Sequence, residues 1–254
     1  MSIFDSHAHY LDSRFDEDRD ELLTALFRNG VCGIVEGGTD VNASAEAVAL
    51  AQRYPQFYAT VGIHPQEAAE TTLEDIAKLR ELAANRKTVG IGEIGLDYYW
   101  EERCPRLVQQ QWFRAQLELA NELSMPVVIH DREAHEDTLH ILKEYHPEGI
   151  LHCFSGSVEM AREILNLGMY ISLGGVVTFK NARKTVEVAS YVPLDRLVLE
   201  TDAPYLAPEP HRGKRCDSSM IRFVAETIAA LRGITADELL QITAENARRA
   251  YRLL

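Results

Sequence analysis

Histidine and carboxylate side chains recur along this chain at the ends of short apolar runs. His7 and His9 lie two residues apart near the N-terminus, and residues at that spacing in a strand point to the same side. Neutral imidazole nitrogen and carboxylate oxygen are ligands that zinc and similar divalent cations take from proteins. Later apolar runs are followed by residues of the same kind: His64, Glu93, His130, His152 and Asp202. The sequence therefore predicts a metal site, provided that the ends of these runs meet.

Eight short apolar runs have the character of buried strands and alternate with longer stretches of helical periodicity. Two helix starts are typical of capping boxes, at residues 71–74 and 235–238. Gly168 and Gly233 suit left-handed helix ends. The predicted strands cover residues 3–7, 31–36, 57–63, 88–93, 126–130, 149–153, 169–173 and 196–200.

Two architectures fit this alternation: an open doubly wound sheet and a closed barrel. In an open sheet the candidate ligands would be spread along one edge, too far apart to share a small site. A barrel brings all strand ends around one mouth, and enzymes with this fold carry their chemistry at the carboxyl end of the strands. We therefore predict an α/β fold of the TIM (β/α)8 barrel type with the metal site at its C-terminal mouth. The length of 254 residues fits one such domain spanning residues 1–254.

Composition and motif absences exclude several other classes of protein. A net charge of −13 argues against a broad basic surface that would hold a long duplex. The four cysteines lie far apart without a C-x-x-C pair, which favours reduced thiols over a disulfide scaffold or a cysteine zinc site. The sequence contains neither a G-x-S-x-G elbow nor a G-x-x-x-x-G-K-[ST] loop, so acyl-serine and P-loop chemistry lack support. It also lacks a signal-peptide pattern and a membrane-spanning apolar run, and we expect a cytoplasmic protein without a membrane partner.

Six short motifs occur in order along nearly the whole chain: residues 5–9 (DSHAH), 62–65 (GIHP), 92–97 (GEIGLD), 130–134 (HDREA), 152–156 (HCFSG) and 200–206 (ETDAPYL). Together they resemble the motifs of the TatD family of metal-dependent deoxyribonucleases, within the wider amidohydrolase-like barrels. The resemblance implies two divalent metal ions, Mg, Mn or Zn, with Glu93 bridging them. The ligands that it implies are His7, His9, Glu93, His130, His152 and Asp202.

This chemistry explains why such side chains are needed. Two cations about 3.5–4 Å apart can bind a phosphodiester oxygen, lower the pKa of a shared water and stabilise the attacking and leaving oxygens. Catalytic roles are expected for Glu93 as the bridge, for Asp202 as the base that takes a proton from the water, and for His64 as a group that polarises or hydrogen-bonds the phosphate. The expected substrate is DNA, as single strands or frayed ends trimmed by an exonuclease. We expect a monomer without an obligate protein partner.

Positive charge close to these motifs is scarce, which limits the candidates for phosphate binding. Arg132 either contacts a phosphate or pairs with an acidic neighbour. Arg212 and Lys214 belong to a compact basic loop at residues 211–215. This loop either contacts phosphate or is simply solvated, and the resemblance favours phosphate contact. The family commonly has Asn and Pro after this R-G-K sequence, whereas here Cys216 and Asp217 follow, so the family's substrate preference does not carry over safely.

The aromatic residues at 98–100 (YYW) leave a further choice open, because they can either stack a base or pack against the protein.

Two other functions compete with the nuclease hypothesis. An amidohydrolase or lactonase acting on a small molecule is compatible with the same barrel, but many of those enzymes use a modified lysine as the metal bridge. Here the fourth predicted strand ends in Glu93, and Lys87 is the nearest preceding lysine, which favours the nuclease. A non-catalytic protein that keeps the site for structure or partner binding is the third hypothesis, and the complete ligand set argues against it.

Overall fold

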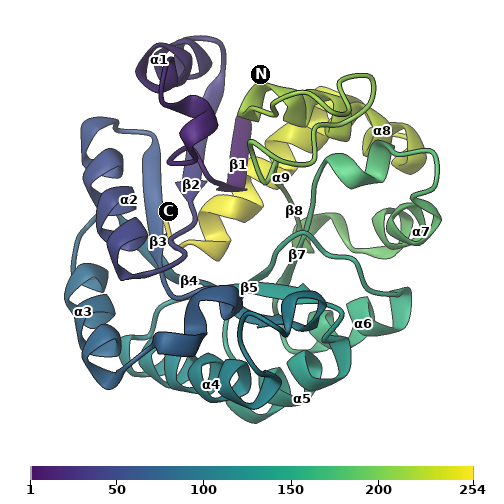
Figure 1. The fold of residues 1–254 in the computed structure, drawn as a ribbon. Coiled ribbons are helices and arrows are strands. Elements are labelled where there is room, and N and C mark those ends of the chain that lie inside the picture. The colour runs from purple at the N-terminus through teal and green to yellow at the C-terminus, as the bar shows by residue number, and fades with distance from the viewer. Residues whose placement is uncertain (1, 254) are drawn as a thin grey trace.

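Eight parallel strands alternate with helices in the computed structural model, which describes residues 2–253 (Figure 1). The strands pair in chain order to form one sheet. All eight predicted strands are confirmed, although their ends differ from the prediction: β4 continues to Asp97, while β6 and β8 end at Leu151 and Leu199. The strands are β1 (Ile3–Ala8), β2 (Val31–Glu36), β3 (Phe57–Val61), β4 (Thr88–Asp97), β5 (Val127–Arg132), β6 (Gly149–Leu151), β7 (Tyr170–Leu173) and β8 (Leu197–Leu199).

Hydrogen bonds between β1 and the segment after β8 bring the two ends of the sheet together. The backbone N–H of Asp202 donates to the carbonyl of His7 at 3.0 Å, and that of His9 donates to Ala203 at 2.7 Å. The Ser6 hydroxyl donates to the carbonyl of Leu199 at 3.0 Å. The architecture is therefore the predicted TIM barrel rather than an open sheet.

An outer ring of helices covers the strands (Figure 1). The helices are α1 (Arg19–Arg28), α2 (Val41–Arg53), α3 (Leu73–Ala83), α4 (Arg106–Leu123), α5 (His135–Tyr145), α6 (Val158–Asn166), α7 (Arg183–Tyr191), α8 (Ile221–Arg232) and α9 (Ala236–Ala250). Short 3-10 turns lie at η1 (Ser13–Phe15), η2 (Pro65–Glu70), η3 (Tyr98–Trp100), η4 (Gly175–Thr178), η5 (Leu194–Arg196) and η6 (Ser218–Met220). Within residues 2–253, no helix combines the length and apolar character that crossing a membrane requires.

The helix-end predictions are confirmed except for one start. The capping box of α9 uses Thr235 and Glu238, as predicted, and Gly233 ends α8 with φ +67°. The box predicted at residues 71–74 is wrong by one position, because Thr72 and Asp75 form it. Thr71 closes the preceding turn η2 instead, where its N–H donates to Ala68.

Helix α9 closes the amino-terminal end of the barrel. Its residues Ala244, Ala247 and Ala250, with Tyr251, pack against apolar side chains that come mostly from the second position of a strand, such as Phe4. The Tyr251 hydroxyl donates to the carbonyl of Ser6 at 2.6 Å. These side chains thus fill the barrel at its amino-terminal end, and the carboxyl end remains open.

Candidate metal centre

The carboxyl ends of the strands surround a pocket of about 1050 Å³. This volume is slightly above the typical range for small-molecule sites, about 300–1,000 Å³. His7 lies beneath it and is fully buried. The other residues predicted to bind metal or act in catalysis all line the pocket: His9, His64, Glu93, His130, His152 and Asp202.

Glu93 lies at the centre of this group, and its two oxygens face different histidines. Its Oε2 is 3.2 Å from Nε2 of His7 and 3.3 Å from Nε2 of His9. Its Oε1 is 2.7 Å from Nδ1 of His130 and 2.9 Å from Nε2 of His152. The backbone N–H of Glu93 donates to Gly38 at 2.8 Å, which fixes the strand at this point. The carboxylate therefore divides the site into two halves.

Asp202 joins the half around Oε2. Its Oδ1 lies 3.4 Å from Nε2 of His9 and 3.9 Å from Nε2 of His7. His7, His9 and Asp202 form one group whose potential ligand atoms lie within 4.8 Å of one another, and His7, Glu93 and His152 form another. The even spacing of the first two histidines thus brings them to a common point, as predicted.

His64 joins the other half. Its Nε2 is 3.4 Å from Oε1 of Glu93, and its ring lies edge-on to that of His130 with centroids 4.4 Å apart. The N–H of Gln66 donates to Nδ1 of His64 at 3.2 Å. Because Nδ1 accepts this bond, the neutral ring carries its proton on Nε2, facing the pocket.

Two carboxylates that had no predicted role contact the histidines around Oε1. Asp97 places Oδ2 3.2 Å from Nε2 of His130, and Glu200 places Oε1 3.5 Å from Nδ1 of His152. Both carboxylates are buried, and each has one oxygen without a hydrogen-bond partner among the described residues. A signal for Asp97 was available: it lies four residues after Glu93 in the same strand, and even spacing favours a common face.

Gly37 is a further functional position that the sequence analysis missed. It follows β2 and lines the pocket. A Cβ at this position would come within 2.6 Å of the His7 ring and 2.9 Å of the His9 ring, closer than packed carbon atoms approach. The absence of a side chain leaves room for both imidazoles.

The electrostatics of the site favour positive charge at two places. Burial opposes ionisation of Glu93, but His152, His64 and His7 around it hold its pKa well below the ordinary value. Burial also opposes protonation of His9 and His152, yet the carboxylates facing them raise the pKa of each well above normal. These two histidines lie beside different oxygens of Glu93. Each half of the site can therefore stabilise a cation.

The donor set fits divalent cations. Ligand atoms 2.0–2.1 Å from one tetrahedral ion lie roughly 3.3 Å from each other. The nitrogen–oxygen distances around Glu93 range from 2.7 to 3.4 Å. Among the residues described, no lysine or arginine forms an ion pair with Glu93 or Asp202. Histidines are thus the immediate partners of these carboxylates, as in sites that hold zinc or similar ions.

The predicted phosphate-binding residues occupy different places. Arg132 lines the pocket, and its guanidinium carbon lies 4.0 Å from the centre of the Tyr99 ring. Arg212 and Lys214 are exposed and do not line it, and the Arg212 guanidinium covers the Phe179 ring at 4.2 Å. Asp217, at the departure from the family pattern, caps η6 by accepting from the N–H of Ser219 at 2.9 Å.

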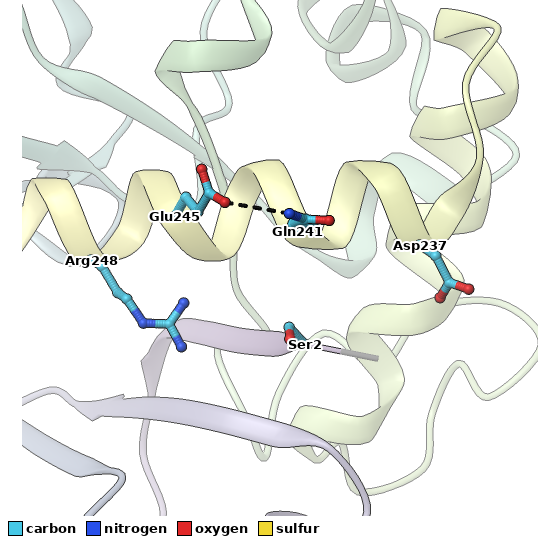
Figure 2. A pocket seen from close by; sticks show the side chains of 5 residues that line it. All are labelled: Ser2, Asp237, Gln241, Glu245 and Arg248. Atoms are coloured by element: carbon cyan, nitrogen blue, oxygen red, sulfur yellow. Dashed lines mark hydrogen bonds between the residues drawn. The ribbon is translucent and has the colours of Figure 1, made fainter. Parts of the chain in front are cut away.

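A second hollow, of about 380 Å³, lies beside α9 at the start of β1 (Figure 2). Its lining residues are Ser2, Asp237, Gln241, Glu245 and Arg248. Gln241 and Glu245 lie one turn apart on α9 and are joined by a 3.5 Å contact. This hollow is at the amino-terminal end of the barrel, where enzymes of this fold do not carry out chemistry. The candidate site is therefore the mouth.

Comparisons with known proteins bear on the family of this chain. The family model described as TatD related DNase matches residues 4–252. The "uncharacterized metal-dependent hydrolase YabD" of Bacillus subtilis is 44% identical, covering 99% of both chains. The "3'-5' ssDNA/RNA exonuclease TatD" of Erwinia tasmaniensis is 37% identical over 99% of this chain and 100% of that protein. Among solved structures, the TatD homologue YJJV of Escherichia coli superposes with a TM-score of 0.92 at 30% identity, covering 98% of both chains.

Proposed function

The chain belongs to the TatD-related DNase family of metal-dependent hydrolases, and from this premise we propose that it cleaves phosphodiester bonds in DNA. The substrate is a single strand or a frayed end, trimmed by an exonuclease. The observation that carries the proposal is the division of the site by Glu93, whose two oxygens face separate sets of histidines. That arrangement suits a bridge between two cations.

In this proposal, His7, His9, Asp202 and Glu93 would hold one divalent ion. His130 and His152, with the same Glu93, would hold a second. When bound, such a pair supplies a nucleophile at neutral pH and neutralises charge on the reacting phosphate.

The remaining steps belong to residues of the chain. Asp202 takes the proton from the attacking water, because its carboxylate lies at the pocket wall with 19% of the side chain exposed. His64 donates from Nε2 to a phosphate oxygen, a role for which the Gln66 N–H fixes the tautomer. Arg132 contacts a neighbouring phosphate from the same wall. Asp97 and Glu200 hold the imidazoles of His130 and His152 in orientation.

Metal-free protein supplied with Mg²⁺, Mn²⁺ or Zn²⁺ and end-labelled DNA tests the proposal. Single-stranded, blunt duplex and frayed duplex substrates should be compared, with chelator as the matched control. The expected product ladder starts at one end, requires a divalent ion and forms faster on single strands and frayed ends. If the DNA stays intact with every metal and the protein hydrolyses a small lactone or amide, the small-molecule hydrolase becomes the better hypothesis.

A further inference from the structure

An exposed aromatic ring lies against an arginine that lines the mouth. Tyr99 is 47% exposed, and the Arg132 guanidinium lies 4.0 Å from the centre of its ring. We infer that these two residues, the Tyr99 platform, form a stacking subsite for an unpaired nucleic-acid base next to the reacting phosphate. The inference rests on the proposed function and goes beyond it by naming what binds the base.

The strands place the platform beside the metal centre. Arg132 ends β5, two residues after His130, and it pairs in register with Asp97 on β4. Tyr99 follows Asp97 by two residues, in the turn η3. The platform is therefore built on the same two strand ends that hold Glu93 and His130. A base bound there belongs to a nucleotide close to the cleaved bond.

The three aromatic residues of η3 have different environments. These environments distinguish rings that pack against the protein from a ring that is free to stack a base. Tyr98 is buried and its hydroxyl donates to Asp137 at 2.6 Å, so it anchors the turn. Trp100 lines the pocket with its ring edge-on to Tyr99, at 5.0 Å between centroids. Tyr99 is the exposed ring of this anchored turn. Its ring is thus held in place while much of its surface stays free.

Arg132 differs from the other arginines that lie over exposed tyrosines. Arg14, over Tyr205, is held by Asp12, and Arg162, over Tyr191, donates to the hydroxyl of that tyrosine. The side chain of Arg132 makes no hydrogen bond or ion pair with any residue in the described range 2–253. Its planar guanidinium and its N–H donors are therefore available to a ligand.

A base is the ligand that this chemistry favours. Bases stack on aromatic rings and on guanidinium planes regardless of sequence, whereas bases inside a duplex already stack on each other. The chain carries a net charge of −13, and carboxylates such as Glu67 and Glu133 line the mouth, which weakens attraction for a polyanion. Stacking adds affinity that does not depend on net charge. The platform also gives a physical reason for preferring unpaired strands.

Binding and turnover measurements on Tyr99→Ala test the inference. A single-stranded oligonucleotide carrying 2-aminopurine is titrated with metal-free protein, and binding is followed by anisotropy and by 2-aminopurine fluorescence. KM and kcat are measured separately with metal. The expected result is about tenfold weaker binding, equivalent to about 1.4 kcal/mol, with reduced quenching, a higher KM and a smaller change in kcat. Tyr99→Phe, which keeps the ring, should retain the affinity.

Tyr191→Ala is the matched control, because Tyr191 is also exposed and covered by an arginine, but its arginine, Arg162, does not line the mouth as Arg132 does. It should bind and turn over like the wild type. If the wild type cleaves the oligonucleotide and Tyr99→Ala has the same affinity, quenching and KM, the platform is overturned and the nuclease proposal stands. A wild type that neither binds nor cleaves the oligonucleotide would overturn both.

Discussion

Asp202 is fixed by its backbone as well as by its side chain. Its N–H donates to the carbonyl of His7 at 3.0 Å, and its Oδ1 lies 3.4 Å from Nε2 of His9. The carboxylate is thus held beside the first two histidines without depending on a lysine or arginine. A residue held in this way can lose its charge without losing its position.

Asp202→Asn should therefore keep the fold and lower kcat by about a hundredfold or more, the scale of losing a general base. The measurement is turnover on single-stranded DNA together with metal content and circular dichroism. Near-normal turnover in a folded, metal-loaded variant would show that another group takes the proton.

Glu200→Gln tests the residues behind the ligands. Because the carboxylate faces Nδ1 of His152 at 3.5 Å, removing its charge should weaken metal binding about 10- to 100-fold, as is typical of such outer partners. Competition with a chromogenic chelator measures the affinity. Glu148→Gln, at an exposed carboxylate paired with Arg252, is the control and should match the wild type. Equal affinities in the two variants would assign Glu200 a purely structural role.

The residues that meet at Glu93 could be predicted because each follows an apolar run, and parallel strands bring such ends together. Asp97, Glu200 and Gly37 could not be assigned in the same way. The two carboxylates act through contacts with histidines, and the glycine acts by leaving space. Contacts of this kind exist only once the strands are in register.

At the level of elements, the junction of β1 with the segment after β8 determines whether the mouth stays assembled. Buried Asp5 accepts from the N–H of Thr201 at 2.9 Å and from its hydroxyl at 2.6 Å. The Ser218 hydroxyl also lies 2.7 Å from Asp5, and the Thr201 hydroxyl accepts from Ala203 at 3.0 Å. One hydroxyl thus satisfies two buried groups on the segment that carries Asp202.

Thr201→Val should lower the free energy of unfolding by about 2–3 kcal/mol, because it removes a hydrogen bond to the buried Asp5 carboxyl and leaves the buried N–H of Ala203 unpaired. Thr243→Val is the control: this buried hydroxyl donates within α9 to Leu239, and its loss should cost about 1 kcal/mol. Urea unfolding with equal m-values measures both. A smaller loss for Thr201→Val than for the control would contradict the importance of this junction.

All eight strands could be predicted because parallel strands covered on both faces form continuous apolar runs. Their ends were less predictable. Strand β4 runs on to Asp97 with every residue buried, and polar residues inside it resembled the end of a strand. The start of α3 shifted by one residue because adjacent threonines compete for the cap, and the preceding turn takes Thr71.

At the scale of the whole molecule, the net charge of −13 makes local positive charge valuable. Arg212 and Lys214 are exposed and lie outside the pocket lining. Their role in phosphate binding remains a prediction. The double change Arg212→Ala and Lys214→Ala should raise KM for DNA and flatten its salt dependence, with a smaller effect on kcat, since fewer counterions are released. If the salt dependence of KM is unchanged, the loop is simply solvated and does not bind phosphate.

A metal titration of the wild type and of Glu93→Gln tests whether this one carboxylate organises two cations for hydrolysis. Bound ions per chain and turnover on end-labelled single-stranded DNA should be measured in the same samples. We expect two ions per wild-type chain, with turnover that follows the occupancy of both. In Glu93→Gln we expect the loss of at least one ion and of turnover. Full turnover with a single ion, or two ions and normal turnover in Glu93→Gln, would contradict this role of Glu93.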